Sequence, residues 1–185
     1  MKNILAFSFA FLFTLASFAQ SSTSNPQKFL SSLREHCGKA YKGEIVSPNP
    51  PADFKDKELI MKVVSCKEEE VKISFFVGED LSRTWVFTLE DGKVKLKHDH
   101  RHQDGTPDKV TMYGGTATNT GFADMQFFPS DQETVDMMSS IAGNVWWVTI
   151  KDNKYTYNLK RVDSTGFFSA SFDLSNTVET DKMPW

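Results

Sequence analysis

Cysteine is scarce in this chain of 185 residues, which contains two, while proline and glycine are ordinary at seven and ten. Two cysteines are too few for a disulfide-dense scaffold or a four-cysteine zinc site. A formal net charge of −3 argues against a general nucleic-acid binder, so none is expected as a partner. Aromatic residues are abundant, however, and sixteen Phe and four Trp can fill the core of one globular domain.

The first segment has the pattern of a secretory signal. A short basic start is followed by an uncharged apolar run over 4–18 and by small residues at Ser17 and Ala19. We predict a signal peptide over 1–19, cut between Ala19 and Gln20, and a single domain over 20–185 that is secreted or periplasmic. The alternative is an uncleaved anchor, but the run is short for a membrane span, and no later segment could form one.

Export would permit the two cysteines to pair. The sequence predicts the disulfide Cys37–Cys66, whose loop of about 30 residues corresponds to roughly 3.5 kcal/mol of stabilisation in the loop-entropy account. The alternative is two free thiols. No C-x-x-C motif suggests a redox centre.

An amphipathic helix is expected at the start of the domain. Ser24 or Asn25 can cap it, and Gly38 can end it. Its apolar face is defined by residues at helical spacing, with the cysteine in the last turn: Phe29, Leu30, Leu33 and Cys37.

Beyond Gly38 the hydrophobic period changes to two, which indicates strands. A short helix is expected near 130–142, within 129–143, begun by a capping box of Ser130 and Glu133. Asp152 and Asn153 are expected to form a tight hairpin turn. The expected strands are 41–45, Glu58–Cys66, Val71–Val77, Arg83–Leu89, Val94–His102, Lys109–Thr116, Phe122–Phe128, Asn144–Lys151, Lys154–Val162 and Phe167–Leu174.

About ten short strands with short connections predict an all-β, mainly antiparallel sheet. A meander of this length tends to close, because closure removes exposed edges. We therefore expect a calycin- or lipocalin-like meander β-barrel. A two-sheet β-sandwich is the alternative.

One cluster of histidines stands out, since His98, His100 and His102 are three of the four in the chain. Val94 and Leu96 set the parity of this strand, and continuing it places all three imidazoles on the inside. Such a cluster can ligate a metal, hydrogen-bond a ligand or form a purely structural network.

As a metal site, the histidines would use Asp108 as a further ligand, with His36 and Asp104 as additional candidates. Imidazole ligands favour zinc or copper. A regular strand makes three ligands on one ion difficult, so a bend or a ligand from another strand would be needed.

As a ligand pocket, the same histidines would be joined by Arg83 and Tyr113. Arg83 shares the inward parity of Trp85 and Phe87, and a buried guanidinium needs a carboxylate or an anionic ligand. Tyr113 precedes Gly114 and Gly115, which indicate a bulge or bend.

A set of segments, which includes the run H-D-H-R-H, is distinctive in this chain: Ser82–Trp85, Leu96–His102, Asp104–Asp108, Tyr113–Gly115, Phe128–Pro129, Asn144–Trp146 and Phe172–Leu174. Through these segments the chain resembles a family of small secreted bacterial proteins over roughly 29–185. The resemblance implies export from a bacterial cell and implies no reaction.

The motifs of common hydrolases and nucleotide-binding proteins do not occur in the sequence. The leading hypothesis is an exported barrel that holds a small molecule or a metal ion near the histidines. The alternatives are a metal-dependent hydrolase that uses the same histidines and a purely structural envelope protein. The oligomeric state is left open.

Overall fold

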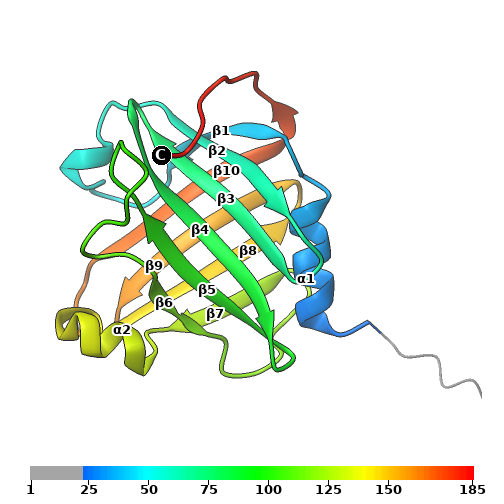
Figure 1. Cartoon of the computed structure of the whole chain (residues 1–185), viewed down its shortest axis with the longest axis vertical. Coiled ribbons are helices and arrows are strands. Elements are labelled where there is room, and N and C mark those ends of the chain that lie inside the picture. Colours follow the sequence, from blue (N-terminus) through cyan, green and yellow to red (C-terminus); the bar gives the residue numbers. More distant parts are fainter. Residues whose placement is uncertain (1–22) are drawn as a thin grey trace, which may run out of the picture.

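The computed structural model describes residues 23–185, and the predicted signal peptide and its cleavage site lie outside them. Within these residues ten strands form one antiparallel sheet, ordered β6-β5-β4-β3-β2-β1-β10-β9-β8-β7. The sheet curls into a nearly closed meander barrel (Figure 1), so the barrel prediction is confirmed. The strands are β1 (Ala40–Ile45), β2 (Leu59–Cys66), β3 (Glu70–Val77), β4 (Asp80–Glu90), β5 (Lys93–His100), β6 (Tyr113–Thr116), β7 (Met125–Pro129), β8 (Asn144–Lys151), β9 (Lys154–Arg161) and β10 (Phe167–Thr177).

The turn between β8 and β9 forms at the predicted residues. Elsewhere, local hydrogen bonds make the strands shorter than predicted. Asp152 and Asn153 have φ values of 53° and 57°, which suit a tight turn between β8 and β9. The strand expected over Lys109–Thr116 is only β6, because the Asp108 carboxylate accepts the amide hydrogen of Val110 at 3.0 Å. Such local bonds compete with the sheet ladder.

The loop between β6 and β7 is also longer than predicted. The strand expected over Phe122–Phe128 is Met125–Pro129, and Asn119 Oδ1 accepts the amide hydrogen of Gly121 at 2.8 Å in the preceding turn. Likewise the strand expected over Val94–His102 ends at His100, because the chain folds back there and His102 N donates to Thr106 O at 2.9 Å.

Helix α1 (Asn25–Arg34) covers one end of the barrel, where it packs against β2, β3, β4 and β7 (Figure 1). Ser24 is its N-cap, and the Ser24 amide donates to Gln27 Oε1 at 2.9 Å. The predicted face is buried through Phe29, Leu30 and Leu33. Cys37 lies in the turn after the helix rather than in its last turn.

The predicted disulfide Cys37–Cys66 is confirmed, with a Cα–Cα distance of 6.1 Å. It joins the turn after α1 to the end of β2 and so fixes the helix over its end of the barrel. No helix within residues 23–185 is long and apolar enough to cross a membrane.

The second helical region is shorter than predicted and has a different cap. It consists of α2 (Gln132–Met137) and the 3-10 turn η2 (Ser139–Ile141). Asp131, not Ser130, caps α2, because its carboxylate accepts the amide hydrogen of Thr134 at 2.9 Å. The Ser130 hydroxyl instead donates to Ile141 O at 2.7 Å.

The seam between β6 and β7 closes without a regular ladder among the described residues. Asp131 N donates to Gly114 O at 3.0 Å, and the buried Thr134 hydroxyl bridges Gly114 N and Gly114 O at 2.7 and 2.9 Å. Gly115 is needed for this approach, since a Cβ there would lie 1.7 Å from Pro129 O. A side chain and a close glycine contact therefore replace strand pairing.

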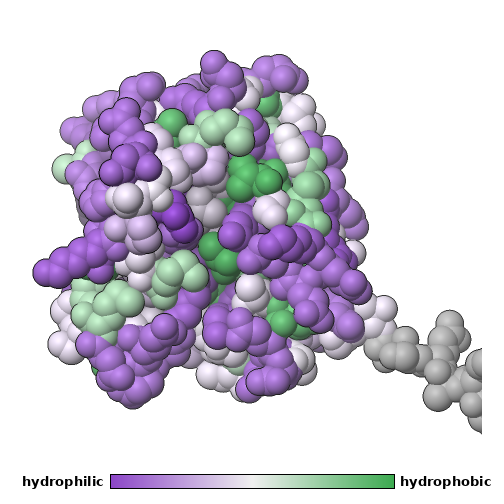
Figure 2. Space-filling view, in the orientation of Figure 1, coloured by the Kyte–Doolittle hydropathy of each residue, from purple (hydrophilic) through white to green (hydrophobic). Residues whose placement is uncertain are grey.

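The face of the molecule shown in Figure 2 is mainly hydrophilic, with small separate apolar patches. A second buried cluster, separate from the main core, is formed by Ala40, Ile60 and Phe76, and Val178 of the C-terminal segment packs against it. Lys62 Nζ holds that segment by donating to Thr180 O and Lys182 O, each at 3.2 Å.

Candidate functional site

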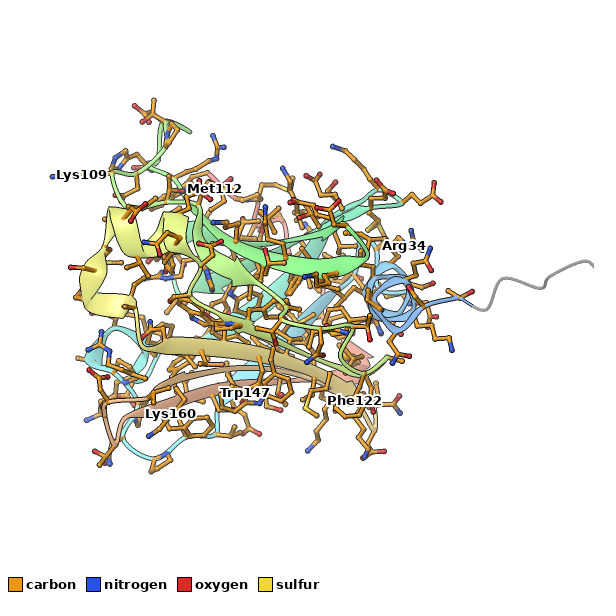
Figure 3. All side chains as sticks on the ribbon, turned by 90° about the horizontal axis from the view of Figure 1, so that it is seen from below. Arg34, Lys109, Met112, Phe122, Trp147 and Lys160 are labelled. Atoms are coloured by element: carbon orange, nitrogen blue, oxygen red, sulfur yellow. A yellow bond between two sulfur atoms is a disulfide. The ribbon has the colours of Figure 1, made fainter. Side chains whose placement is uncertain are left out.

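A cavity of about 220 Å³ lies toward the end of the barrel opposite α1. In Figure 3, Arg34 marks the α1 end, and Lys109 and Met112 mark the loops at the other end. Most of the wall is apolar. The cavity is lined by Pro51, Phe54, Phe75, Arg83, Thr84, Trp85, His98, His100, Tyr113, Tyr157, Leu159 and Phe168.

Stacked aromatic rings form much of the wall. Phe75 lies parallel to Trp85 with ring centroids 4.9 Å apart, and Trp85 lies parallel to Tyr157 at 4.5 Å. Phe54, from the 3-10 turn η1 (Ala52–Phe54), meets Phe168 at 4.9 Å. The long loop between β1 and β2 therefore completes a wall that the strands leave open.

The polar residues of the cavity come from three adjacent strands, except for Tyr157, which comes from β9. Arg83 on β4 pairs with His100 on β5, while His98 on β5 pairs with Trp85 on β4 and with Tyr113 on β6. The inward parity predicted for His98 and His100 is confirmed, because both line the cavity.

The residues of opposite parity lie on the outer face of β5, but two of them are not exposed to solvent. Lys97 is buried and pairs with Asp131 at 2.9 Å and Glu133 at 2.7 Å. Asp99 is also buried and accepts a hydrogen bond from Arg101 at 3.1 Å. The region around α2 and the loop after β5 covers this outer face, which a strand pattern alone does not reveal.

His98 is fully hydrogen-bonded. Its Nδ1 lies 3.0 Å from the carbonyl oxygen of Tyr113, which can only accept, so Nδ1 carries the hydrogen. Its Nε2 then accepts from the Tyr157 hydroxyl at 2.7 Å. Burial lowers the pKa of His98 to about 3, so the ring is neutral at physiological pH.

His100 is less constrained. Its Nε2 lies 3.2 Å from the Tyr113 hydroxyl. Burial and the positive charge of Arg83 lower the pKa of His100, while Asp108, Asp80 and Asp99 oppose the shift. Burial raises the pKa of Tyr113 to about 12, so its hydroxyl stays protonated.

Arg83 has one carboxylate partner, Asp80, three residues earlier on β4. Its guanidinium lies over the Phe54 ring, with Cζ 5.7 Å from the centroid. Burial alone would raise the pKa of Asp80, but hydrogen bonds from Ser82 and Arg83 bring it below the usual value. A carboxylate or an anionic ligand was expected from the sequence as the partner of Arg83, and Asp80 provides the carboxylate.

His102 and Asp108 do not line the cavity. His102 is exposed on the loop after β5, so the interior position expected for it is wrong. The cause is the early end of β5 at His100. Asp108 uses its carboxylate in the turn to Val110.

The predicted metal site has no preformed ligand set. From residue 23 onward, no three His, Cys, Asp or Glu side chains are grouped so as to hold one ion. His36 contacts the Tyr41 hydroxyl at 2.6 Å, in the turn after α1, and Asp104 accepts the amide hydrogen of Thr106 at 2.9 Å. Zinc or copper ligation by these residues stays a prediction.

Several residues of the site were not anticipated. Pro51 and Phe54 come from an irregular loop, where the one signal was an aromatic residue beside three prolines. The interior position of Tyr157 follows from its parity in β9, but its bond to His98 depends on two strands that are distant in sequence.

Comparison with known proteins adds no relative. No protein-family model matches the chain, and no curated protein or solved structure matches it either.

Proposed function

We propose that this protein is an exported binding protein that holds a small molecule in the cavity beside His98 and His100. The single observation that carries the proposal is the cavity itself. It is about 220 Å³ in size, its walls are mainly aromatic, and a few polar groups converge on it. That combination is typical of small-molecule sites.

The polar residues have different roles in this proposal. Arg83, His100 and Tyr113 contact the ligand. His98 and Tyr157 form part of the cavity wall and make no hydrogen bond to the ligand, because their side chains are hydrogen-bonded to each other. His102 and Asp108 take no part.

Export is proposed on two grounds. The sequence predicts a signal peptide, and the disulfide Cys37–Cys66 suits an oxidising compartment. Detection of the chain in the periplasm or medium, beginning at Gln20, supports this part of the proposal. Retention in the cytoplasm with residues 1–19 intact contradicts it.

Binding can be tested with benzyl alcohol, a neutral single-ring probe. Trp85 lines the cavity, so tryptophan fluorescence and the thermal midpoint should both change when the probe binds. Leu159→Trp should abolish the response by filling the cavity. Leu174→Trp is the matched control, because Leu174 packs against the core without lining the cavity.

A saturable response in the wild type and the Leu174→Trp variant, with none in Leu159→Trp, supports the proposal. No response to benzyl alcohol or to any other single-ring probe overturns it. Native mass spectrometry of the exported protein provides a second measurement, since a retained small molecule would add mass that Leu159→Trp should lose.

A further inference from the structure

The guanidinium of Arg83 is only partly used by the protein. Its side chain is 24% exposed, and Nη1 donates to Asp80. Within residues 23–185, Nε and Nη2 have no protein acceptor, although Arg83 lines the cavity. These two donors are not among the buried unpaired atoms and keep access to solvent, so an anionic ligand in the cavity can reach them and replace water there.

A second potential donor faces the same place. His100 is directly opposite Arg83 on the neighbouring strand, and within residues 23–185 its imidazole has one hydrogen-bond contact, between Nε2 and the Tyr113 hydroxyl. Together, Arg83 and His100 can present a fork of N–H groups and one imidazole to a planar anion. Arginine matches a carboxylate especially well, because its donors can bind both oxygens.

Three carboxylates lie near this pair. Asp80 pairs with Arg83 and Asp99 pairs with Arg101, while Asp108 accepts the amide hydrogen of Val110 and keeps its charge. If a ligand brings a carboxylate, His100 can take up a proton, because the ligand then adds its negative charge to those of Asp108, Asp80 and Asp99, which already favour the protonated imidazole. Without the ligand, burial and Arg83 keep the imidazole neutral.

The size and walls of the cavity limit the rest of the ligand. An apolar cavity of about 150 Å³ holds benzene, so one of about 220 Å³ has room for roughly nine heavy atoms. The walls beside Arg83 are the rings of Phe54, Trp85 and Phe168. A flat ring fits between such surfaces, because aromatic pairs favour offset-stacked or edge-to-face packing.

From these observations we infer that the cavity binds a single-ring aromatic carboxylate, with the carboxylate at Arg83 and His100 and the ring against the aromatic wall. This inference rests on the proposed binding function and adds the chemical class of the ligand. His98 remains a wall residue, since both of its ring nitrogens are used.

The inference can be tested with four matched probes: benzoate, benzamide, benzylammonium and cyclohexanecarboxylate. Calorimetry and tryptophan fluorescence on the full exported chain give the dissociation constants. Benzoate should bind at least tenfold more tightly than benzamide, and benzylammonium should be weakest. Cyclohexanecarboxylate should lie between benzoate and benzylammonium, because it keeps the charge and loses the flat ring.

Variants then test whether Arg83 and Asp80 determine the preference for benzoate over benzamide. Arg83→Gln should reduce the benzoate-to-benzamide ratio to near one while benzamide still binds. Arg83→Lys should keep part of the ratio. Asp80→Asn should strengthen benzoate binding severalfold and leave benzamide unchanged, because it removes the competing carboxylate. Arg34→Gln removes an equal charge at the far end of the barrel and should leave the binding of benzoate and benzamide unchanged (Figure 3).

The pH dependence provides an independent readout. Proton uptake by His100 should make benzoate binding up to about tenfold tighter per unit as the pH falls from 8 to 6. The groups that face His100 are Arg83 and Asp80 on β4, Asp99 on its own strand, Asp108 on the loop and Tyr113 on β6. His100→Gln should flatten the dependence.

The outcomes separate this inference from the proposed function. If benzamide and benzylammonium bind as tightly as benzoate, the anion preference is wrong and the binding function stands. If no probe binds, the binding function itself fails. An Asp80→Asn variant that does not strengthen benzoate binding also overturns the inference, and this test does not depend on losing Arg83.

Discussion

The Tyr157 hydroxyl lies 2.7 Å from His98 Nε2 and fixes the imidazole as a neutral acceptor at that nitrogen. The other nitrogen donates to the carbonyl of Tyr113, so β5, β6 and β9 are joined through one buried ring. The most conspicuous histidine of the sequence is therefore a structural connection across the barrel. A metal could bind Nε2 only by displacing the tyrosine.

The first prediction concerns the pH dependence of stability. The pKa of His98 is about 3 in the folded protein, below the ordinary value of about 6.5 expected on unfolding. The unfolded state therefore binds more protons between these values, and the stabilisation is complete above pH 6.5 and is lost as the pH falls. From pH 7.5 to pH 5 the loss from His98 should be about 2 kcal/mol.

Urea unfolding at several pH values checks this prediction. His98→Gln should show a shallower slope between pH 6.5 and pH 5 than the wild type. His102→Gln should keep the wild-type slope, because its position is exposed. Equal slopes in wild type and His98→Gln would show that His98 does not stay neutral on folding.

The second prediction concerns Thr134 at the barrel seam. Thr134→Val keeps the shape but removes the hydroxyl that bridges Gly114 N and Gly114 O. The buried amide of Gly114 then has no partner there, and the free energy of unfolding should fall by about 2 kcal/mol. Thr134→Ser keeps the bridge and should cost less than about 1 kcal/mol. Urea midpoints that rank Val no worse than Ser would contradict the role of the bridge.

The fold followed from the sequence because strand alternation and turn residues are local signals. Asp152 and Asn153 fixed one hairpin, and the parity of Val94 and Leu96 correctly placed His98 inside. The same local signals failed at the helix cap. Ser130 and Asp131 are equally good caps, and the choice depended on Ile141, which accepts the Ser130 hydroxyl.

The site was predictable only in part, for a similar reason. Arg83 and His100 stand out as polar residues on an inward face. Phe54 reaches the cavity from a loop, and Lys97 is buried by acidic groups at α2 that are more than thirty residues away in sequence. Contacts of this kind depend on how the barrel closes, which no local pattern encodes.

The third prediction concerns Gly115. Gly115→Ala would place a Cβ 1.7 Å from Pro129 O, which is backbone and cannot turn aside, so the seam must open. We expect a loss of about 3 kcal/mol. Hydrogen exchange should also show lost protection at the Asp131 amide, which donates to Gly114 O.

Gly143→Ala is the control for this variant, because the nearest atom to its Cβ would be 3.5 Å away. It should leave both stability and the Asp131 amide unchanged. If Gly115→Ala is as stable as Gly143→Ala, then β6 and β7 do not approach as closely as the structure shows.

The last prediction concerns the disulfide, which holds the turn after α1 against the end of β2. Replacing both partners by Cys37→Ala and Cys66→Ala should lower the free energy of unfolding by roughly 3.5 kcal/mol, because a loop of 29 residues is no longer closed in the unfolded chain. Wild type treated with reductant should unfold at the same urea midpoint as the double variant. Benzyl alcohol binding should survive wherever the variant is folded, since the cavity lies at the opposite end of the barrel from α1. A change below about 1 kcal/mol would mean that the packing of Phe29, Leu30 and Leu33 holds the helix without the crosslink.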